Sequence, residues 1–253
     1  GESGQDVRRE NARVRTGRMA HEAVGLRAGH DAHVPVDPAG PEGRCRYVQR
    51  SRVEVRLQAG ETLLVLGAAG GVGLAAVEIG KAMGARVIGA VSSVEKADLV
   101  RAAGADDCII YPQQPFDKDA SKALAEQFKA AVGPKGADVI YDAVGGDYAE
   151  PALRSIAWEG RFLVVGFPAG IPKLALNLTL LKSCDVCGVF WGAFAARDPE
   201  GNRAHISQLF DWWAAGKIQP RITATYPLER GGEAIAALGD RKAAGKLVVE
   251  IKP

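Results

Sequence analysis

The chain has 253 residues, of which 47% are hydrophobic and 25% charged, and its formal net charge is +2. These values are typical of a globular protein with a large core, and they give no reason to expect a nucleic acid or an anionic membrane as partner. Because no apolar run reaches the length of a membrane span and no signal segment opens the sequence, we expect neither feature.

Cysteine usage bears on the cellular compartment and on metal binding. The sequence has 4 cysteines, too few and too scattered for a disulfide framework, which favours a reducing, cytoplasmic setting. Cys184 and Cys187 have the spacing of half a zinc site, but no second cysteine pair lies near them. Two small buried residues are the better interpretation, so we predict no metal site.

Residues 1–56 differ in composition from the rest of the chain. They contain more than half of the arginines and no lysine, and the run "HVPVDPAGPEG" at 33–43 is typical of turns and loops. Sustained periodicity of either kind is missing. We predict an irregular, Arg-rich segment that is disordered or of foreign origin, such as a stretch read in an altered frame.

A regular pattern begins after Leu57. The run "TLLVLG" is a short, continuous apolar segment of the kind that is buried on both faces of a parallel sheet. Strands and helices then alternate, which predicts an α/β fold with a doubly wound, mostly parallel sheet and right-handed crossovers. The predicted strands are 62–67, 86–91, 107–111, 137–144, 160–166 and 185–192, and the predicted helices are about 71–83, 94–103, 118–132, 147–156 and 201–215.

A glycine cluster separates the first predicted strand from the first predicted helix. Gly67, Gly70, Gly71 and Gly73 would permit a tight turn, let backbone approach a pyrophosphate and let the helix pack closely on the strand. The helix N-terminus would offer unpaired N–H groups to the phosphates. A turn required only by packing is the alternative, but the position in the first βαβ unit favours a dinucleotide site.

The end of the second predicted strand narrows the choice of dinucleotide. An NAD-selective site usually carries Asp or Glu there, whereas this chain has Ser92 and Ser93, followed by Lys96. Hydroxyls and a cation would hold a 2′-phosphate, and a hydrogen bond to a charged group contributes roughly 1.5–3 kcal/mol, or about tenfold to hundredfold in affinity. We therefore predict NADPH, although Glu95 opposes this and Lys96 has the alternative role of a solvated lysine.

Several motifs in the same order resemble one known family. "AGETLLVLGAAGGVGLAAVEIGKAMGARVIGAVSS", "GADDCIIY", "GADVIYDAVGGD", "GRFLVVGFPAG" and "GKLVVEI" are similar to the zinc-independent quinone oxidoreductase branch of the medium-chain dehydrogenase/reductase superfamily. The resemblance covers roughly residues 57–253. It implies a Rossmann NADP(H)-binding domain at 57–216 and a segment at 217–253 that returns to a catalytic domain.

The resemblance also implies an activity and partners. The family transfers a hydride or electrons from NADPH to a small-molecule acceptor, a quinone or a similar activated alkene or carbonyl. It uses neither a covalent nucleophile nor a metal, so that positioning and exclusion of water carry the reaction. Family members pair through the last strand of the sheet, which implies a homodimer.

Each matching motif implies cofactor-binding residues, but the resemblance does not indicate a catalytic residue. For Tyr111 and Asp142 the alternative is a strand-end residue satisfied by its own loop. The resemblance places Gly70, Gly71, Val72 and Gly73 at the pyrophosphate and Ser92, Lys96 and Tyr111 at the 2′-phosphate. It places Asp142, Val144 and Gly145 near the ribose and nicotinamide, and Gly166, Phe167 and Pro168 in the nicotinamide-side loop. It places Phe190, Trp191 and Gly192 on the cofactor side after the last strand, and Lys246 near the cofactor.

One part of the family pattern is missing. Full-length relatives carry a β-rich catalytic domain that forms a wall of the substrate cleft, and residues 1–60 are too few to be that domain. The second hypothesis is therefore a catalytically impaired NADPH-binding or scaffold protein. The segments at 221–228 and 245–251 would then leave strand edges exposed. A short-chain dehydrogenase is excluded because no tyrosine begins a Tyr-x-x-x-Lys motif.

Overall fold

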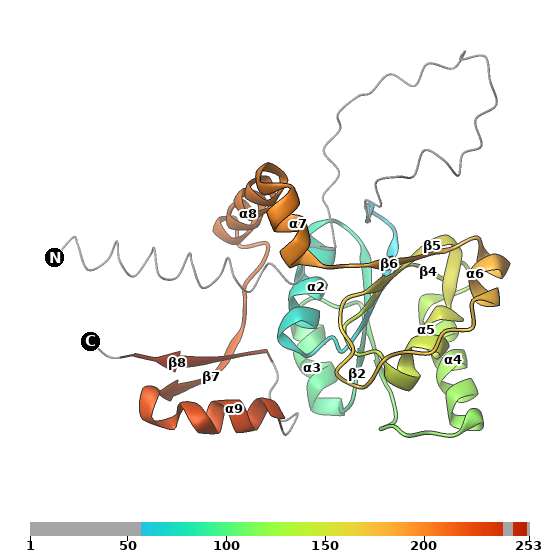
Figure 1. The fold of residues 1–253 in the computed structure, drawn as a ribbon, viewed down its shortest axis with the longest axis horizontal. Coiled ribbons are helices and arrows are strands. Elements are labelled where there is room, and N and C mark those ends of the chain that lie inside the picture. The colour runs from blue at the N-terminus through green and yellow to red at the C-terminus, as the bar shows by residue number, and fades with distance from the viewer. Residues whose placement is uncertain (1–56, 240–244, 252–253) are drawn as a thin grey trace, which may run out of the picture.

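The computed structural model describes residues 57–239 and 245–251. The predictions for residues 1–56 lie outside these ranges. The centre of the fold is a six-stranded sheet in the order β3-β2-β1-β4-β5-β6, in which every neighbouring pair is parallel (Figure 1). This order confirms the predicted doubly wound α/β fold. The strands are β1 (Thr62–Leu66), β2 (Arg86–Val91), β3 (Asp107–Ile110), β4 (Ala137–Asp142), β5 (Ile156–Val164) and β6 (Asp185–Gly188).

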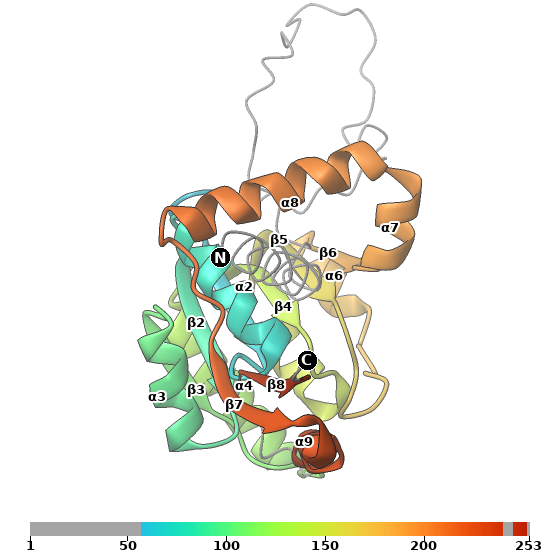
Figure 2. The ribbon, with the colours of Figure 1, turned by 90° about the vertical axis from the view of Figure 1, so that its left-hand side faces the viewer.

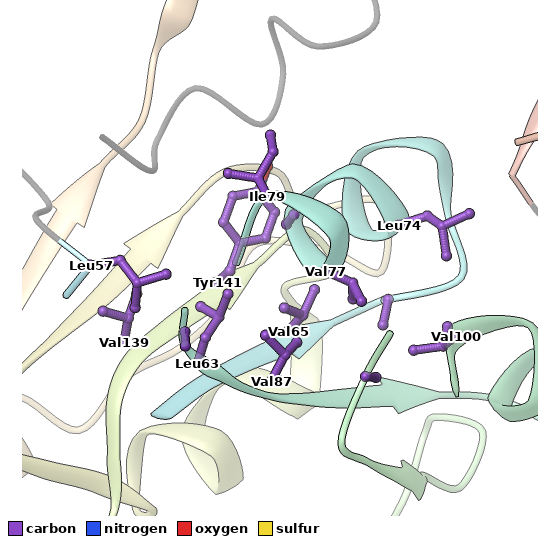
Figure 3. Close-up of a cluster of buried hydrophobic side chains, with 14 of the residues drawn as sticks. Leu57, Leu63, Val65, Leu74, Val77, Ile79, Val87, Val100, Val139 and Tyr141 are labelled. Atoms are coloured by element: carbon purple, nitrogen blue, oxygen red, sulfur yellow. The ribbon is translucent and has the colours of Figure 1, made fainter. Parts of the chain in front are cut away.

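Helices cover both faces of this sheet. α2 (Gly71–Ala82) and α3 (Val94–Ala102) pack on one face, and α4 (Lys118–Val132) and α5 (Ala149–Leu153) pack on the other. Alternate residues of β1 belong to different clusters, since Leu63 lies under α2 and Leu64 lies under α4. Figure 3 shows the cluster on the α2 face, in which Val77 of α2 points toward the strands; Leu74 of the same helix is also buried. The continuous apolar run of β1 is therefore explained by burial on both faces.

The structure corrects the predicted boundaries on both sides of β5. We expected a helix to residue 156 and a strand from 160, but the chain forms the short η2 (Gly146–Tyr148) and α5, and β5 begins at Ile156. The register between β4 and β5 shifts between Ala137 and Val139, and Glu159 takes a positive φ of 56°. This bulge interrupts the apolar pattern, and for that reason the sequence does not predict the first residues of β5.

The predicted strand 185–192 was wrong beyond Gly188. Val189 donates a last hydrogen bond to the Val164 carbonyl at 2.9 Å, and β5 ends at that residue, so the chain after it has no strand to pair with. The apolar run instead continues into α7 (Trp191–Arg197), which is followed by α8 (Pro199–Ala214). α6 (Asn177–Lys182), which precedes β6, was also not predicted.

The last part of the described chain forms a separate small sheet. β7 (Ile222–Pro227) and β8 (Lys246–Glu250) pair in parallel, joined through η3 (Leu228–Arg230) and α9 (Gly231–Gly239). Figures 1 and 2 show this unit beside α2, away from the six-stranded sheet. Within the described ranges, none of the helices is both long and apolar enough to cross a membrane.

Candidate dinucleotide site

The strand order places the predicted site residues that follow β1 to β5 at one edge of the sheet. β1 lies between β2 and β4, so the strands before β4 in the sequence extend the sheet to one side of β1 and the later strands extend it to the other. This change of direction opens a crevice at the carboxyl ends of β1 and β4. The loops that follow β1, β2, β4 and β5 meet at this edge. In such a fold a dinucleotide lies across the crevice, with one half on the β2 side and the other on the β4 side.

The glycine turn after β1 requires glycine at two positions, residues 67 and 73. The N–H groups of Gly67 and Ala68 both donate to the Ala90 carbonyl of β2, at 3.0 and 3.1 Å, and Gly67 has a positive φ of 70°. A Cβ at Gly73 would lie 2.2 Å from the Gly67 carbonyl oxygen and 2.8 Å from the Ala68 Cα. Helix α2 can approach β1 this closely only because residue 73 has no side chain.

The N-terminus of α2 has no side-chain cap among the described residues. In the described chain Gly70 is its N-cap and offers no side-chain cap, and no acidic residue lies in the first turn. The next two long helices differ, because Ser93 caps α3 and Asp117 caps α4 with a side-chain oxygen. The backbone N–H groups at the start of α2 therefore suit a phosphate, which fits the pyrophosphate of a dinucleotide. This region contains Gly70, Gly71, Val72 and Gly73, the first group of predicted residues.

Ser92, Ser93 and Lys96 lie together at the end of β2, but the two serines have different hydrogen-bonding roles. The Ser93 hydroxyl accepts the Lys96 backbone N–H at 3.3 Å and caps α3, whereas the Lys96 ammonium donates to the Ser92 hydroxyl at 3.1 Å. Ser92 and Lys96 thus form a half-buried polar pair beside the crevice. The exposed Glu95 stays ionised, because its hydrogen bond with Ser93 holds its pKa below the usual range. Its charge works against an anionic ligand at this position.

Tyr111 follows β3 and is tied into the core. Its N–H donates to the Val91 carbonyl at 2.9 Å, and its buried ring packs on Tyr148 with a centroid distance of 4.6 Å. The ring therefore has a packing role whether or not its hydroxyl also meets a ligand.

Asp142 ends β4 and is only 1% exposed. One carboxylate oxygen, Oδ1, accepts the N–H groups of Val144 and Gly145 at 2.9 and 2.8 Å, which fixes the turn after the strand. The other oxygen, Oδ2, is buried and has no hydrogen-bond partner among the described residues. Burial raises the pKa of this carboxyl more than the two hydrogen bonds lower it. Gly145 takes a positive φ of 69°, which this turn requires.

The remaining predicted residues follow β5 and β6, except for Lys246, which belongs to the separate β7–β8 unit. Gly166, Phe167 and Pro168 form the loop after β5, and the side chains of Phe167 and Phe190 are exposed. Trp191 donates from its indole Nε1 to Asn202 of α8 at 3.2 Å, which orients α7, with Gly192 in its first turn. Lys246 begins β8, and the preceding Gly245 donates its N–H to the Ala69 carbonyl in the glycine turn at 2.9 Å.

One residue that links these loops was not predicted from the sequence. Gln114, in the loop between β3 and α4, hydrogen bonds to both the segment after β4 and the segment after β5. Its partners lie 33 and 55 positions away, and no pattern in the sequence marks it.

The cysteine pair considered as half of a zinc site is divided between two faces of the sheet. Cys184 packs in the cluster under α4 and α5, and Cys187 packs in the cluster under α2. In the part of the chain that the structure describes, no group of three or more His, Cys, Asp and Glu side chains could hold a metal ion.

Comparison with known proteins agrees with this geometry. Residues 71–211 match the family model described as zinc-binding dehydrogenase. The chain belongs to the medium-chain dehydrogenase/reductase superfamily. Within it, the chain is 38% identical over 202 residues to quinone oxidoreductase-like protein 2 homolog of Nematostella vectensis and 37% identical over 199 residues to quinone oxidoreductase-like protein 2 of Rattus norvegicus. The resemblance seen in the sequence is thus confirmed.

Solved structures place the superfamily fold on the same part of the chain. A mycobacterial protein complexed with NADPH superimposes with a TM-score of 0.68 at 29% identity, covering 81% of this chain and 60% of that one. A quinone oxidoreductase of Pseudomonas syringae gives a TM-score of 0.65 at 30% identity with the same coverage. The described six-stranded unit is therefore an NAD(P)-binding domain of this superfamily.

The matched relatives are longer than this chain. The alignments cover 79% of the chain but 53% of the Nematostella protein, and 78% of the chain but 55% of the rat protein. The chain spans about half the length of the curated relatives it matches.

Proposed function

We propose that this chain binds NADPH and is the cofactor-binding part of a zinc-free oxidoreductase whose acceptor is a quinone or a similar activated alkene or carbonyl. The observation that carries the proposal is the glycine turn with an uncapped helix N-terminus, next to the Lys96–Ser92 pair at the end of β2. NADPH in a solved relative and the quinone oxidoreductase-like relatives support the cofactor and the acceptor class.

Each group of site residues has a distinct task in this proposal. The N–H groups at the start of α2 hold the pyrophosphate, and Lys96 with Ser92 holds the 2′-phosphate that distinguishes NADPH from NADH. The loops after β4 and β5 orient the nicotinamide half and shield it from water. Bound NADPH supplies the hydride, while the protein contributes position and electrostatics.

A second candidate function is a non-catalytic NADPH-binding or scaffold protein. One observation favours it: the β7–β8 unit exposes large hydrophobic residues such as Ile222 and Ile235, as a surface for a partner would. In this case the chain binds NADPH without catalysing its oxidation.

One experiment separates the two candidates. NADPH oxidation is followed by absorbance with 1,4-naphthoquinone, and NADPH binding is followed by its fluorescence in the same preparation, with NADH as the matched control. Turnover with NADPH above the background rate supports the oxidoreductase. Binding without turnover supports the second candidate. Absence of NADPH binding rejects both.

We also propose that two copies pair through β6. This strand ends the sheet, and the exposed apolar residues Leu180, Val186 and Phe190 lie on or beside it. Unpaired strand edges of this kind favour association. Light scattering should give a dimer for the natural chain and a monomer for Val186→Lys, whereas Val94→Lys, at an exposed position of α3, should remain dimeric. A monomeric natural chain contradicts the proposal.

The proposed location is the cytoplasm, on the low and scattered cysteine content of the sequence.

A further inference from the structure

Gln114 lies at the junction of three loops on the carboxyl edge of the sheet. Its side-chain Nε2 donates to the Ala169 carbonyl at 2.5 Å, and its Oε1 accepts the Asp147 N–H at 3.2 Å. One amide group therefore contacts both the segment 143–148 after β4 and the segment 166–170 after β5. We call these two segments the β4/β5 rim.

The backbone of Gln114 is itself fixed. Its N–H donates to the Tyr148 hydroxyl at 3.1 Å, and that hydroxyl donates to the Pro112 carbonyl at 2.9 Å. Tyr148 is buried, and its ring packs between Tyr111 and Phe116, with centroid distances of 4.6 and 5.4 Å. The amide of Gln114 is thus held in place before any ligand arrives.

The two segments of the β4/β5 rim are packed together closely. Gly146 donates its N–H to the Gly170 carbonyl at 2.7 Å, and Ala169 donates its N–H to the Val144 carbonyl at 2.9 Å. A Cβ at Gly146 would lie 2.6 Å from both the Ala169 carbonyl oxygen and Gln114 Oε1. Loss of the amide therefore removes both direct links from Gln114 to the rim, and the Ala169 carbonyl, which is half-buried, loses its Gln114 donor.

We infer that Gln114 is a positioning residue for the nicotinamide half of the dinucleotide. It follows β3, on the side of the crevice that receives the adenosine half, but its side chain holds the segments on the opposite side. It does not bind the cofactor itself. It fixes the β4/β5 rim against which the nicotinamide ring lies. The inference rests on the proposed NADPH binding.

The test compares a whole cofactor with a fragment. The affinities of the full chain for NADPH and for adenosine 2′,5′-bisphosphate, which lacks the nicotinamide half, are measured by calorimetry. Gln114→Ala should weaken NADPH binding about tenfold, the order expected for two neutral hydrogen bonds, and leave the fragment unchanged. The increase in NADPH fluorescence on binding, measured at saturating NADPH, should also be smaller for Gln114→Ala than for the natural chain. Gln113→Ala, at the exposed neighbouring position, should change neither affinity.

The outcomes separate this inference from the proposed function. Equal weakening of both ligands, or no weakening of either, by Gln114→Ala overturns the positioning role while the natural chain still binds NADPH. A natural chain that binds neither ligand overturns the proposed function and the inference with it. If Gln114→Ala does not fold, Tyr148→Phe removes the hydroxyl that holds the Gln114 backbone and should give the same selective loss, to a smaller extent.

Discussion

The two sheets of the described chain bury very different amounts of their surface. In the six-stranded sheet the inner strands are covered on both faces, and Phe162 of β5 is 0% exposed. In the two-stranded sheet Ile222 of β7 is 58% exposed, and α9 buries Ala234 but leaves Ile235 and Leu238 exposed. Parallel strands are normally buried on both faces, and an isolated pair of strands has little stability of its own. The six-stranded sheet is stabilised by the core that it forms with its own helices. The two-stranded sheet has no comparable core and depends on contacts outside the β7–β8 unit.

The largest expected difference between the two regions is in the cost of truncating a strand residue. Phe162→Ala should lower the free energy of unfolding by about 3–5 kcal/mol, because it opens a cavity in the core. Ile222→Ala should change it by less than about 0.5 kcal/mol, as expected for an exposed residue. Urea unfolding measures both. Similar costs would mean that β7 is covered in solution, and the comparison would fail.

A second pair of variants contrasts glycines in the two regions. Gly73→Ala should cost about 1–3 kcal/mol and abolish NADPH binding, because its Cβ would meet the Gly67 carbonyl oxygen at 2.2 Å and open the turn. Gly232→Ala in α9 has no atom within 4 Å of the new Cβ and should be neutral or stabilising by up to about 1 kcal/mol. Thermal unfolding and NADPH fluorescence provide the measurements. Normal cofactor binding by Gly73→Ala would contradict the role of the turn.

Glu78 of α2 connects the two regions, and its removal should have a smaller effect. Its buried carboxylate accepts the Gln219 N–H at 3.1 Å, in the segment that leads to β7. Glu78→Ala should cost about 1 kcal/mol and speed amide exchange at Gln219 and in β7, but not in β1. Glu78→Gln keeps a carbonyl acceptor and should exchange like the natural chain. Faster exchange in β1 as well would show that the two regions are not separable.

The smallest expected effect is a pH dependence at Asp142. Burial raises the pKa of this carboxyl in the folded state, so the folded chain takes up its proton more readily than the unfolded chain. Its contribution to stability is therefore largest below the ordinary Asp pKa of about 3.9 and declines as the pH rises through the raised pKa. Asp142→Asn removes this decline.

The measurement for Asp142 is a series of melting temperatures between pH 4 and pH 7 for both proteins. The melting temperature of Asp142→Asn minus that of the natural chain should increase with pH and then level off. A difference that decreases with rising pH would mean that the ionised carboxylate is stabilised in the fold.

The sequence was informative where one local pattern determined the structure. Continuous apolar runs predicted β1 and β2, and the glycine spacing predicted the turn at which Gly73 has no room for a side chain. It was misleading where tertiary contacts decide. The run that ends β6 remains apolar into α7, and only the end of β5 at Val164 shows where pairing stops.

Long-range contacts explain what was missed in the candidate site. Gln114 and Tyr148 have no distinctive neighbours in the sequence, and their roles depend on segments brought together by the fold. Ser92 and Ser93 looked equivalent in the sequence, yet one pairs with the Lys96 ammonium and the other caps α3. The two roles differ because Ser93 lies at the N-cap of α3 and Ser92 does not, and the side-chain chemistry of two serines does not reveal this difference.

The central claim is that the six-stranded region contains an NADPH-selective site, and paired titrations of the full chain with NADPH and NADH test it most directly. The natural chain should bind NADPH more tightly than NADH, and Lys96→Ala should weaken NADPH binding about tenfold to hundredfold while leaving NADH unchanged. Lys135→Ala, an exposed lysine just before β4 at the opposite edge of the sheet, should change neither affinity. Equal affinities for the two cofactors, or equal losses with Lys96→Ala, would contradict the claim.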